Sequence, residues 1–144
     1  MYSVVEREIE LLLILSPDQS IPVPAKLLYR TDDPCAVRIT FHVGTDTPVS
    51  WTFARDLLIE GVFRPSGQGD VRVWPSRSEG RDVVLMALSS PEGEALLSAP
   101  AVALSAWLER TLRVVPPGSE GERLGIDTAL TELLTRHVSE GPWA

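Results

Sequence analysis

The chain has 144 residues, of which 44% are hydrophobic and 23% charged, and its formal net charge is −7. This length and composition predict one folded domain with a hydrophobic core, and not a disordered chain. The acidic balance argues against a general binder of nucleic acid or anionic membranes, because neutralising phosphates requires an excess of Lys and Arg. The single cysteine, Cys35, excludes a disulfide framework within the chain and a thiolate cluster for zinc.

The first predicted element is a long strand over Val5–Leu15. Its first half alternates between glutamates on one face and apolar residues on the other. Leu12 and Ile14 then make the second face apolar too, so we expect the end of this strand to be buried on both sides. A helix remains an alternative, because Glu and Leu favour helices. The apolar run is too short to cross a bilayer and follows no basic segment, so we expect a cytosolic protein without membrane insertion.

Three further strands are predicted before the first helix. Ile21–Arg30 carries Pro22 and Pro24, which place its start at a sheet edge or a bulge. Ala36–Val43 alternates apolar and polar residues most regularly, and Val49–Thr52 is a short strand.

The segment Phe53–Arg77 is the most informative part of the chain. Ala54–Glu60 predicts a short helix with its leucines inward, closed by Gly61 in the left-handed conformation. A tight connection rich in Gly and Pro then leads to a strand over Asp70–Trp74. The residues that mark this connection are Pro65, Gly67 and Gly69.

The second half repeats the order of strands followed by a helix. Strands are predicted over Asp82–Leu88 and Glu94–Ser98, and Pro100–Val114 predicts a helix with an apolar stripe. A last amphipathic helix is expected over Ile126–His137, and a loose tail over 138–144.

This order of elements predicts an α+β fold. Strands in runs followed by helices are typical of an antiparallel sheet or barrel-like core, here in two sheet-plus-helix halves. We expect residues 1–137 to form a single domain with 138–144 as a flexible tail. Two or three helices cannot cover both faces of such a sheet, so we expect self-association, with Leu12 and Ile14 at the subunit contact.

Candidate catalytic and metal-binding residues each have a structural explanation. His42 and His137 lack Cys, Asp or Glu at ligand spacing, so surface histidine is favoured over a metal site. Cys35 has no partner histidine signature and is expected to be a small, half-buried residue. Arg55 and Asp56 at a helix start are explained by an ion pair and by the helix dipole. A charged solvent face likewise explains Glu6, Glu8 and Glu10 better than acid–base chemistry.

The loop Gly67–Asp70 has the glycines of a phosphate-binding loop but precedes a strand, lacks Lys-Ser/Thr and ends in a carboxylate. A hairpin turn is therefore predicted. Trp51 and Trp74 on strands could stack nucleobases, but core or interface tryptophans are favoured in an acidic chain. No catalytic constellation remains.

Several linked segments form a pattern in a fixed order. The segments are FARDLLIEGVFRPSGQGDVRVWPSR, ALSSPEGEALLSAP, AWLERT, VPPG and, earlier in the chain, IPVPAKLLYRTDDPCAVRITFHVG. Together they resemble the SsgA-like proteins of sporulating actinomycetes. The resemblance covers about the first 120 residues, and within the family the chain is most like the SsgB branch.

The resemblance implies a non-enzymatic regulator of sporulation-specific cell division without a cofactor. Such a protein helps to localise the tubulin-like GTPase FtsZ at septum sites and promotes its assembly. The resemblance also implies a homotrimer and a fold similar to the Whirly-type single-stranded nucleic-acid binders, so single-stranded nucleic-acid binding is the alternative function. A small-molecule enzyme is a third class, for which the residues give no support.

The positions that match the family pattern are expected to be mostly structural, with the loop among them a candidate partner contact. They are Arg55, Asp56, Leu57, Gly61, Pro65, Gly67, Gly69, Asp70, Val71, Trp74, Pro75, Pro91, Glu92 and Gly93.

Overall fold

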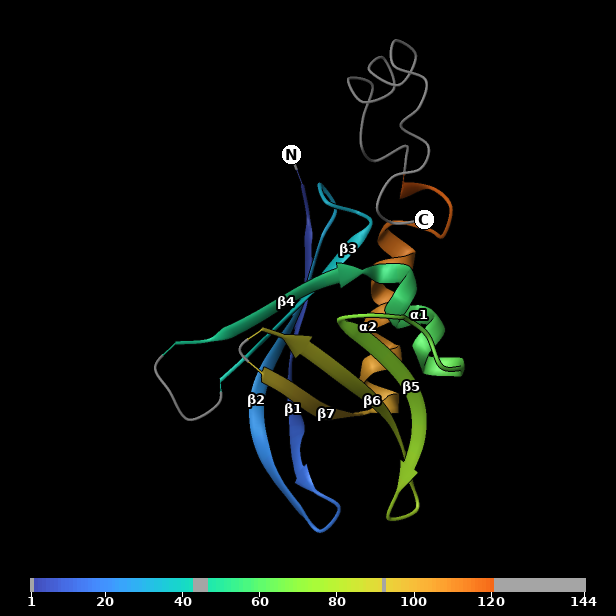
Figure 1. Cartoon of the computed structure of the whole chain (residues 1–144). Coiled ribbons are helices and arrows are strands. Elements are labelled where there is room, and N and C mark those ends of the chain that lie inside the picture. Colours follow the sequence, from blue (N-terminus) through green and yellow to red (C-terminus); the bar gives the residue numbers. More distant parts are fainter. Residues whose placement is uncertain (1, 43–46, 92, 121–144) are drawn as a thin grey trace.

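A computed structural model describes residues 2–42, 47–91 and 93–120 of the chain. They form one antiparallel sheet with two helices packed on it (Figure 1). The elements in chain order are β1 (Val4–Ser16), β2 (Gln19–Arg30), β3 (Ala36–Phe41), β4 (Val49–Ala54), α1 (Arg55–Phe63), β5 (Val71–Ser78), β6 (Arg81–Ser90), β7 (Gly93–Pro100) and α2 (Ala101–Val114). The α+β class and its two sheet-plus-helix halves are confirmed. The predicted helix Ile126–His137 and the tail 138–144 lie outside the described residues.

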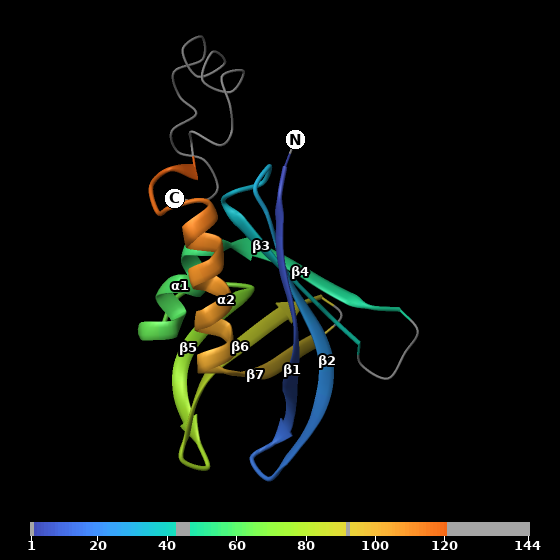
Figure 2. The same ribbon diagram turned by 180° about the vertical axis from the view of Figure 1, so that it is seen from behind.

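The sheet has seven strands in the order β4-β3-β2-β1-β7-β6-β5, and every neighbouring pair is antiparallel. The first half of the chain therefore supplies four adjacent strands and the second half three. The halves join where Leu12 lies opposite Ser98 and Leu13 opposite Leu97. Both helices lie on the same side of the curled sheet (Figures 1 and 2). We call the sheet face beneath the helices the inner face, and the opposite face the outer face.

The core lies between the inner face and the helices, and the period-two pattern of the strands explains it. In β6 the inward residues Val84 and Met86 are fully buried, and Leu97 of β7 lies beside them. Trp107 of α2 is also fully buried, and its indole Nε1 donates a hydrogen bond to the Val5 carbonyl of β1, 3.1 Å away. This bond satisfies the polar atom of the largest core side chain and joins α2 to the N-terminal strand.

Gly61 does not close α1, contrary to the prediction from sequence. The helix continues through Gly61 to Phe63, and Arg64 follows in an extended conformation. Gly61 is buried against β5, and a Cβ atom at this position would overlap the side chain of Val73. The glycine is therefore explained by the close approach of α1 to β5, and not by a left-handed backbone.

The end of β1 is also different from the prediction. Leu12 and Ile14 lie on the outer face, where Leu12 is 38% exposed, while Leu11 of the inner face is fully buried. Among the described residues no helix covers this part of the outer face (Figure 2). The apolar residues that were expected to be buried on both sides are half open to solvent.

Candidate docking surface

The outer face of the second sheet half carries a row of uncharged side chains, apolar except for the buried Ser98. Register places Trp74 of β5 opposite Leu85 of β6, Leu85 opposite Ser98 of β7, and Ser98 opposite Leu12 of β1. Side chains that face each other across an antiparallel sheet lie on the same side. The row therefore crosses four strands without an intervening charge.

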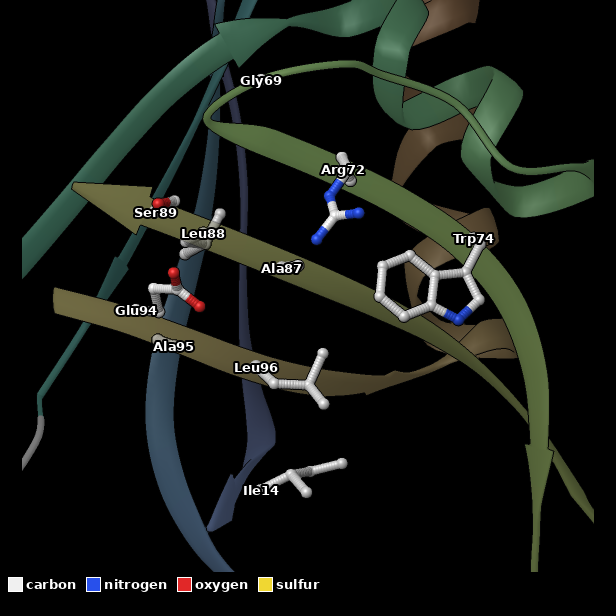
Figure 3. A pocket seen from close by; sticks show the side chains of 10 residues that line it. All are labelled: Ile14, Gly69, Arg72, Trp74, Ala87, Leu88, Ser89, Glu94, Ala95 and Leu96. Carbon is white, nitrogen blue, oxygen red and sulfur yellow. The ribbon is translucent and has the colours of Figure 1, made fainter. Parts of the chain in front are cut away.

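A neighbouring row adds Leu96 of β7 and Ile14 of β1, which both line a hollow of about 550 Å³ (Figure 3). We call the exposed apolar part of this face the outer patch, made of Leu12, Ile14, Trp74, Leu85 and Leu96. All of its members keep part of their surface in solvent, whereas the inward residues Leu11, Val73, Val84, Met86 and Leu97 of the same strands are buried. Partly exposed apolar side chains gathered in this way are typical of a macromolecular contact.

Two opposite charges border the hollow. Arg72 extends from β5 on one side, and Glu94 from β7 on the other (Figure 3). Neither forms an ion pair with another described residue. Ser89 of β6 lies between Leu88 and the end of its strand and adds a hydroxyl to this rim. An apolar centre with a mixed polar border has the composition of a protein interface more than of a phosphate-binding groove.

The predicted turn lies at one end of the same face. Ser66 and Val73 exchange two backbone hydrogen bonds, of 2.8 and 2.9 Å, which close the connection between α1 and β5. Gly67 and Gly69 inside it have φ angles of +95° and +106°, in the region that favours glycine. Gly69 lines the hollow, so the turn fixes one border of the outer patch (Figure 3).

Most of the other family-motif residues lie elsewhere. Asp56 is exposed in the first turn of α1, while Pro65 and Asp70 are exposed on either side of the turn. Pro75 lies within β5, and Pro91 lies exposed in the connection before Gly93, where β7 begins. Glu92 lies outside the described residues. Of the expected motif positions, the hollow thus brings together Gly69 and Trp74 with the expected contact residue Ile14.

Arg55 is almost fully buried, with 1% of its surface exposed. Its Nη1 donates to the Thr111 carbonyl at 3.1 Å, and its Nη2 donates to Glu120 Oε2 at 2.7 Å. The guanidinium also lies over the ring of Tyr29, 4.9 Å from the ring centroid. Arg55 therefore holds the start of α1, the end of α2 and the segment after α2 together.

The carboxyl group of Glu120 responds to this contact. Burial alone would raise its pKa, but the hydrogen bond from Arg55 and backbone N–H groups outweigh burial and hold the pKa below its ordinary value. Sequence analysis expected an ion-paired Arg55 but not its burial or this partner. Glu120 lies 65 positions away in the chain, and no local pattern connects the two residues.

The remaining candidates for chemistry are separate from one another. Cys35 is half-buried, and burial raises the pKa of its thiol. His42 is exposed at the end of β3, and His137 lies outside the described residues. Within the described ranges no three His, Cys, Asp or Glu side chains are grouped so that they could hold a metal ion. In the same ranges no helix is both long enough and apolar enough to span a membrane.

Comparison with known proteins places the chain in a family. A family profile described as "Streptomyces sporulation and cell division protein, SsgA" matches residues 23–120. The chain belongs to the SsgA family. The sporulation-specific cell division protein SsgB of Streptomyces coelicolor is 56% identical over 134 residues, which cover 93% of this chain and 98% of that protein. SsgB of Thermobifida fusca is 45% identical over 128 residues, covering 89% and 93%.

Two solved structures of the SsgA family are similar to this fold. One is described as "Mutations in SsgB correlate to longitudinal cell division during sporulation of Streptomyces coelicolor". It has a TM-score of 0.83 and 58% identity, and the match covers 85% of this chain and 97% of that one. The other is an SsgA-like sporulation-specific cell division protein from Thermobifida fusca, with a TM-score of 0.80, 44% identity and coverage of 91% and 96%. The family resemblance read from the sequence, including the SsgB branch, is thus confirmed.

Proposed function

We propose that this SsgA-family chain is a non-enzymatic adaptor of sporulation-specific cell division. In this proposal it acts in the cytoplasm at the division septum, where it helps to localise FtsZ and promotes FtsZ assembly. The outer patch is the surface that makes contacts with other chains, including the division partner. The relatives of this chain are named as sporulation-specific cell division proteins, which supports the cellular process.

The observation that carries the proposal is the exposed apolar face of the second sheet half. Trp74, Leu85 and Leu96 lie on strands whose inner sides supply the fully buried core residues Val73, Val84, Met86 and Leu97, so the outer side chains are not needed to build the core. Leaving such surface in water has a free-energy cost that a partner removes, at about 25 cal/mol for each Å² of apolar area. Tryptophan in a half-exposed position is also a frequent centre of binding energy at protein interfaces.

A homotrimer belongs to the same proposal. Leu12 and Ile14 form the β1 end of the outer patch, and Trp74 with Arg72 forms its β5 end. We assign the β1 end to the contact between subunits and leave the β5 end for the division partner. In this arrangement the two ends of the outer patch in each chain serve two different contacts.

Co-sedimentation with FtsZ polymers tests the adaptor function. Trp74→Asp places a charge at the β5 end of the outer patch and is expected to reduce the amount that pellets with FtsZ by tenfold or more. The matched control is Val102→Asp, because Val102 is apolar and 80% exposed on α2, on the other side of the sheet. The control is expected to pellet like the unmodified chain. If the unmodified chain does not pellet with FtsZ, or if both variants behave alike, the proposed surface is wrong.

Single-stranded nucleic acid is the alternative ligand, because Trp74 and Arg72 lie together on an open sheet face in the way that stacking platforms do. A Whirly-like relationship would favour this reading. Glu94 on the opposite border and the net charge of −7 oppose it. Filter binding to single-stranded oligonucleotides separates the two functions. Tight binding that weakens steeply with salt would support the alternative, and no binding at low salt would exclude it.

A further inference from the structure

Strand β4 forms an edge of the sheet, and its sequence does not protect that edge. The strand reads VSWTFA, without a charge, a proline or a glycine, and it pairs with β3 over six consecutive positions without a bulge. Natural edge strands commonly carry such features because an open edge invites pairing with another strand. Figure 1 shows the β3–β4 hairpin projecting away from the body of the molecule.

The other edge of the sheet, along β5, is partly blocked. Ser66 forms an isolated antiparallel bridge with Val73, so a piece of the preceding connection already pairs with β5. Further along the same strand Pro75 has no N–H group to offer a neighbour. The two edges of one sheet thus differ, which makes the open state of β4 a specific feature and not a general property of the fold.

The backbone groups available on β4 follow from its register. Arg55 N–H donates to the Cys35 carbonyl at 2.7 Å, and the same register places Val37 opposite Phe53 and Ile39 opposite Trp51. Hydrogen-bonded pairs alternate along an antiparallel ladder. The odd-numbered residues of β4 therefore bond β3, while the N–H and C=O groups of the even-numbered residues point away from the sheet. Among the described residues no backbone hydrogen bond joins Ser50 or Thr52 to a partner on that side.

The side chains of β4 alternate symmetrically about Trp51. Val49, Trp51 and Phe53 face the inner side, and Ser50 and Thr52 face the outer side, where they contact Thr40 and Arg38 of β3. A second β4 strand running antiparallel with Trp51 opposite Trp51 would place apolar beside apolar and hydroxyl beside hydroxyl. In that register Ser50 faces Thr52 of the copy in a hydrogen-bonded pair, which uses the free backbone groups of both strands.

We propose that β4 is a homotypic contact, in which two copies of this chain join their sheets through antiparallel pairing of β4 centred on Trp51. The occupant of the open edge is a second copy because the strand is complementary to itself in side-chain pattern and in backbone hydrogen-bonding phase. A contact of this kind has twofold symmetry. It uses a different surface from the outer patch and does not depend on the proposed function. With a threefold contact through Leu12 and Ile14, it would give particles of six chains if each twofold axis crosses the threefold axis at a right angle.

Cysteine cross-linking tests the register. In a Cys35→Ser background, Trp51→Cys places two thiols directly opposite each other in a non-hydrogen-bonded pair, with Cα atoms about 4.5 Å apart. Mild oxidation is expected to convert most of the chain into a covalent dimer on non-reducing gels. Val49→Cys is the matched control, because Val49 is on the same face but its copy lies about 13 Å further along the strand. Absence of the dimer with Trp51→Cys, or equal dimer with both variants, overturns the proposal.

A second variant tests the contact without a thiol. Thr52→Pro removes an N–H group that points away from β3, so it leaves the pairing with β3 in place and blocks the edge. The mass in solution, measured by light scattering, is expected to fall by half while the thermal unfolding temperature stays within a few degrees. An unchanged mass in a folded Thr52→Pro chain would contradict the β4 contact.

Discussion

Arg55 shows how a single buried cation connects distant parts of this chain. Its guanidinium reaches Thr111 and Glu120 and lies over Tyr29, so the first and second halves meet at one side chain. Burying a cation costs free energy unless it is paired and hydrogen-bonded, and Glu120 supplies the charge. Its Nε is the one buried side-chain nitrogen without a hydrogen-bond partner within the described residues. The residue is therefore sensitive to the loss of either remaining bond.

We predict that Glu120→Gln lowers stability at neutral pH by about 2 kcal/mol, because a hydrogen bond to a charged group is weakened. The folded chain holds the pKa of Glu120 below its ordinary value of 4.5, so the stabilisation is complete above that pH. It is lost as the pH falls through the lower pKa of the folded state. Urea unfolding at neutral and acidic pH should show a difference between the two chains that shrinks in acid.

Glu109→Gln is the control for this measurement, since Glu109 is exposed on α2 and has no ion pair among the described residues. Its effect on stability should be within about 0.5 kcal/mol at either pH. A Glu120→Gln effect that is equally large in acid would show that charge is not the cause.

At the scale of elements, the position of α1 depends on the absence of one side chain. Gly61 lets the helix approach β5 so closely that the backbone carbonyl carbon of Val73 is 3.3 Å from where a Cβ would lie. Leu58, one turn earlier on the helix, is fully buried in the core. The turn that follows α1 is fixed by the Ser66–Val73 bonds, so the contact of α1 with β5 also positions the border of the outer patch.

We predict that Gly61→Ala destabilises the fold by about 1–3 kcal/mol, although alanine is the better helix former by about 1 kcal/mol. The added Cβ must push α1 away from Val73, whose own Cβ is part of a paired strand and cannot rotate away. Chemical denaturation followed by circular dichroism measures the change. Glu60→Ala, one position earlier and exposed, is expected to change stability by less than 1 kcal/mol. A gain in stability for Gly61→Ala would refute the close-packing explanation.

The strands could be predicted from the sequence because their signal is local. Alternation in β3 and in the first half of β1 depends only on neighbouring residues and on one buried face. The role of Gly61 could not be predicted in the same way, because it depends on the distance between α1 and a strand that starts ten positions later. The sequence indicated Leu12, Ile14 and Trp74 as separate candidates but not their grouping with Leu96, since strand order brings them together and periodicity does not reveal it.

At the scale of the whole molecule, the sheet is covered on one side and open on the other. Both helices lie on the inner face, and the core cluster includes residues from both halves of the chain. The outer face divides into two parts. β1 and β2 present Glu8 opposite Lys26, while the second half presents the outer patch. The charged part over β1 and β2 is favourably solvated, whereas the outer patch is favourably buried by another macromolecule.

We predict that Leu12→Asp lowers the assembly mass threefold, counted in chains of 15.8 kDa, because it removes the proposed trimer contact. Leu12 is 38% exposed on the outer patch, so a carboxylate there costs little in the isolated chain and much in an apolar contact. Sedimentation equilibrium of the variant and of Val102→Asp measures the effect at matched concentration. If the mass of Leu12→Asp equals that of the control, Leu12 is not at a subunit contact.

The antiparallel bridge between Ser66 and Val73 affects how many chains can join through the edges of their sheets. A sheet with two receptive borders can add neighbours without end and grow into a fibre. Here the Ser66–Val73 bridge and Pro75 block part of the β5 border, so the proposed joining through β4 would stop after a single addition. Loss of the Ser66–Val73 bridge, and not a stronger contact elsewhere, is the change that would let a finite particle grow into an unlimited polymer.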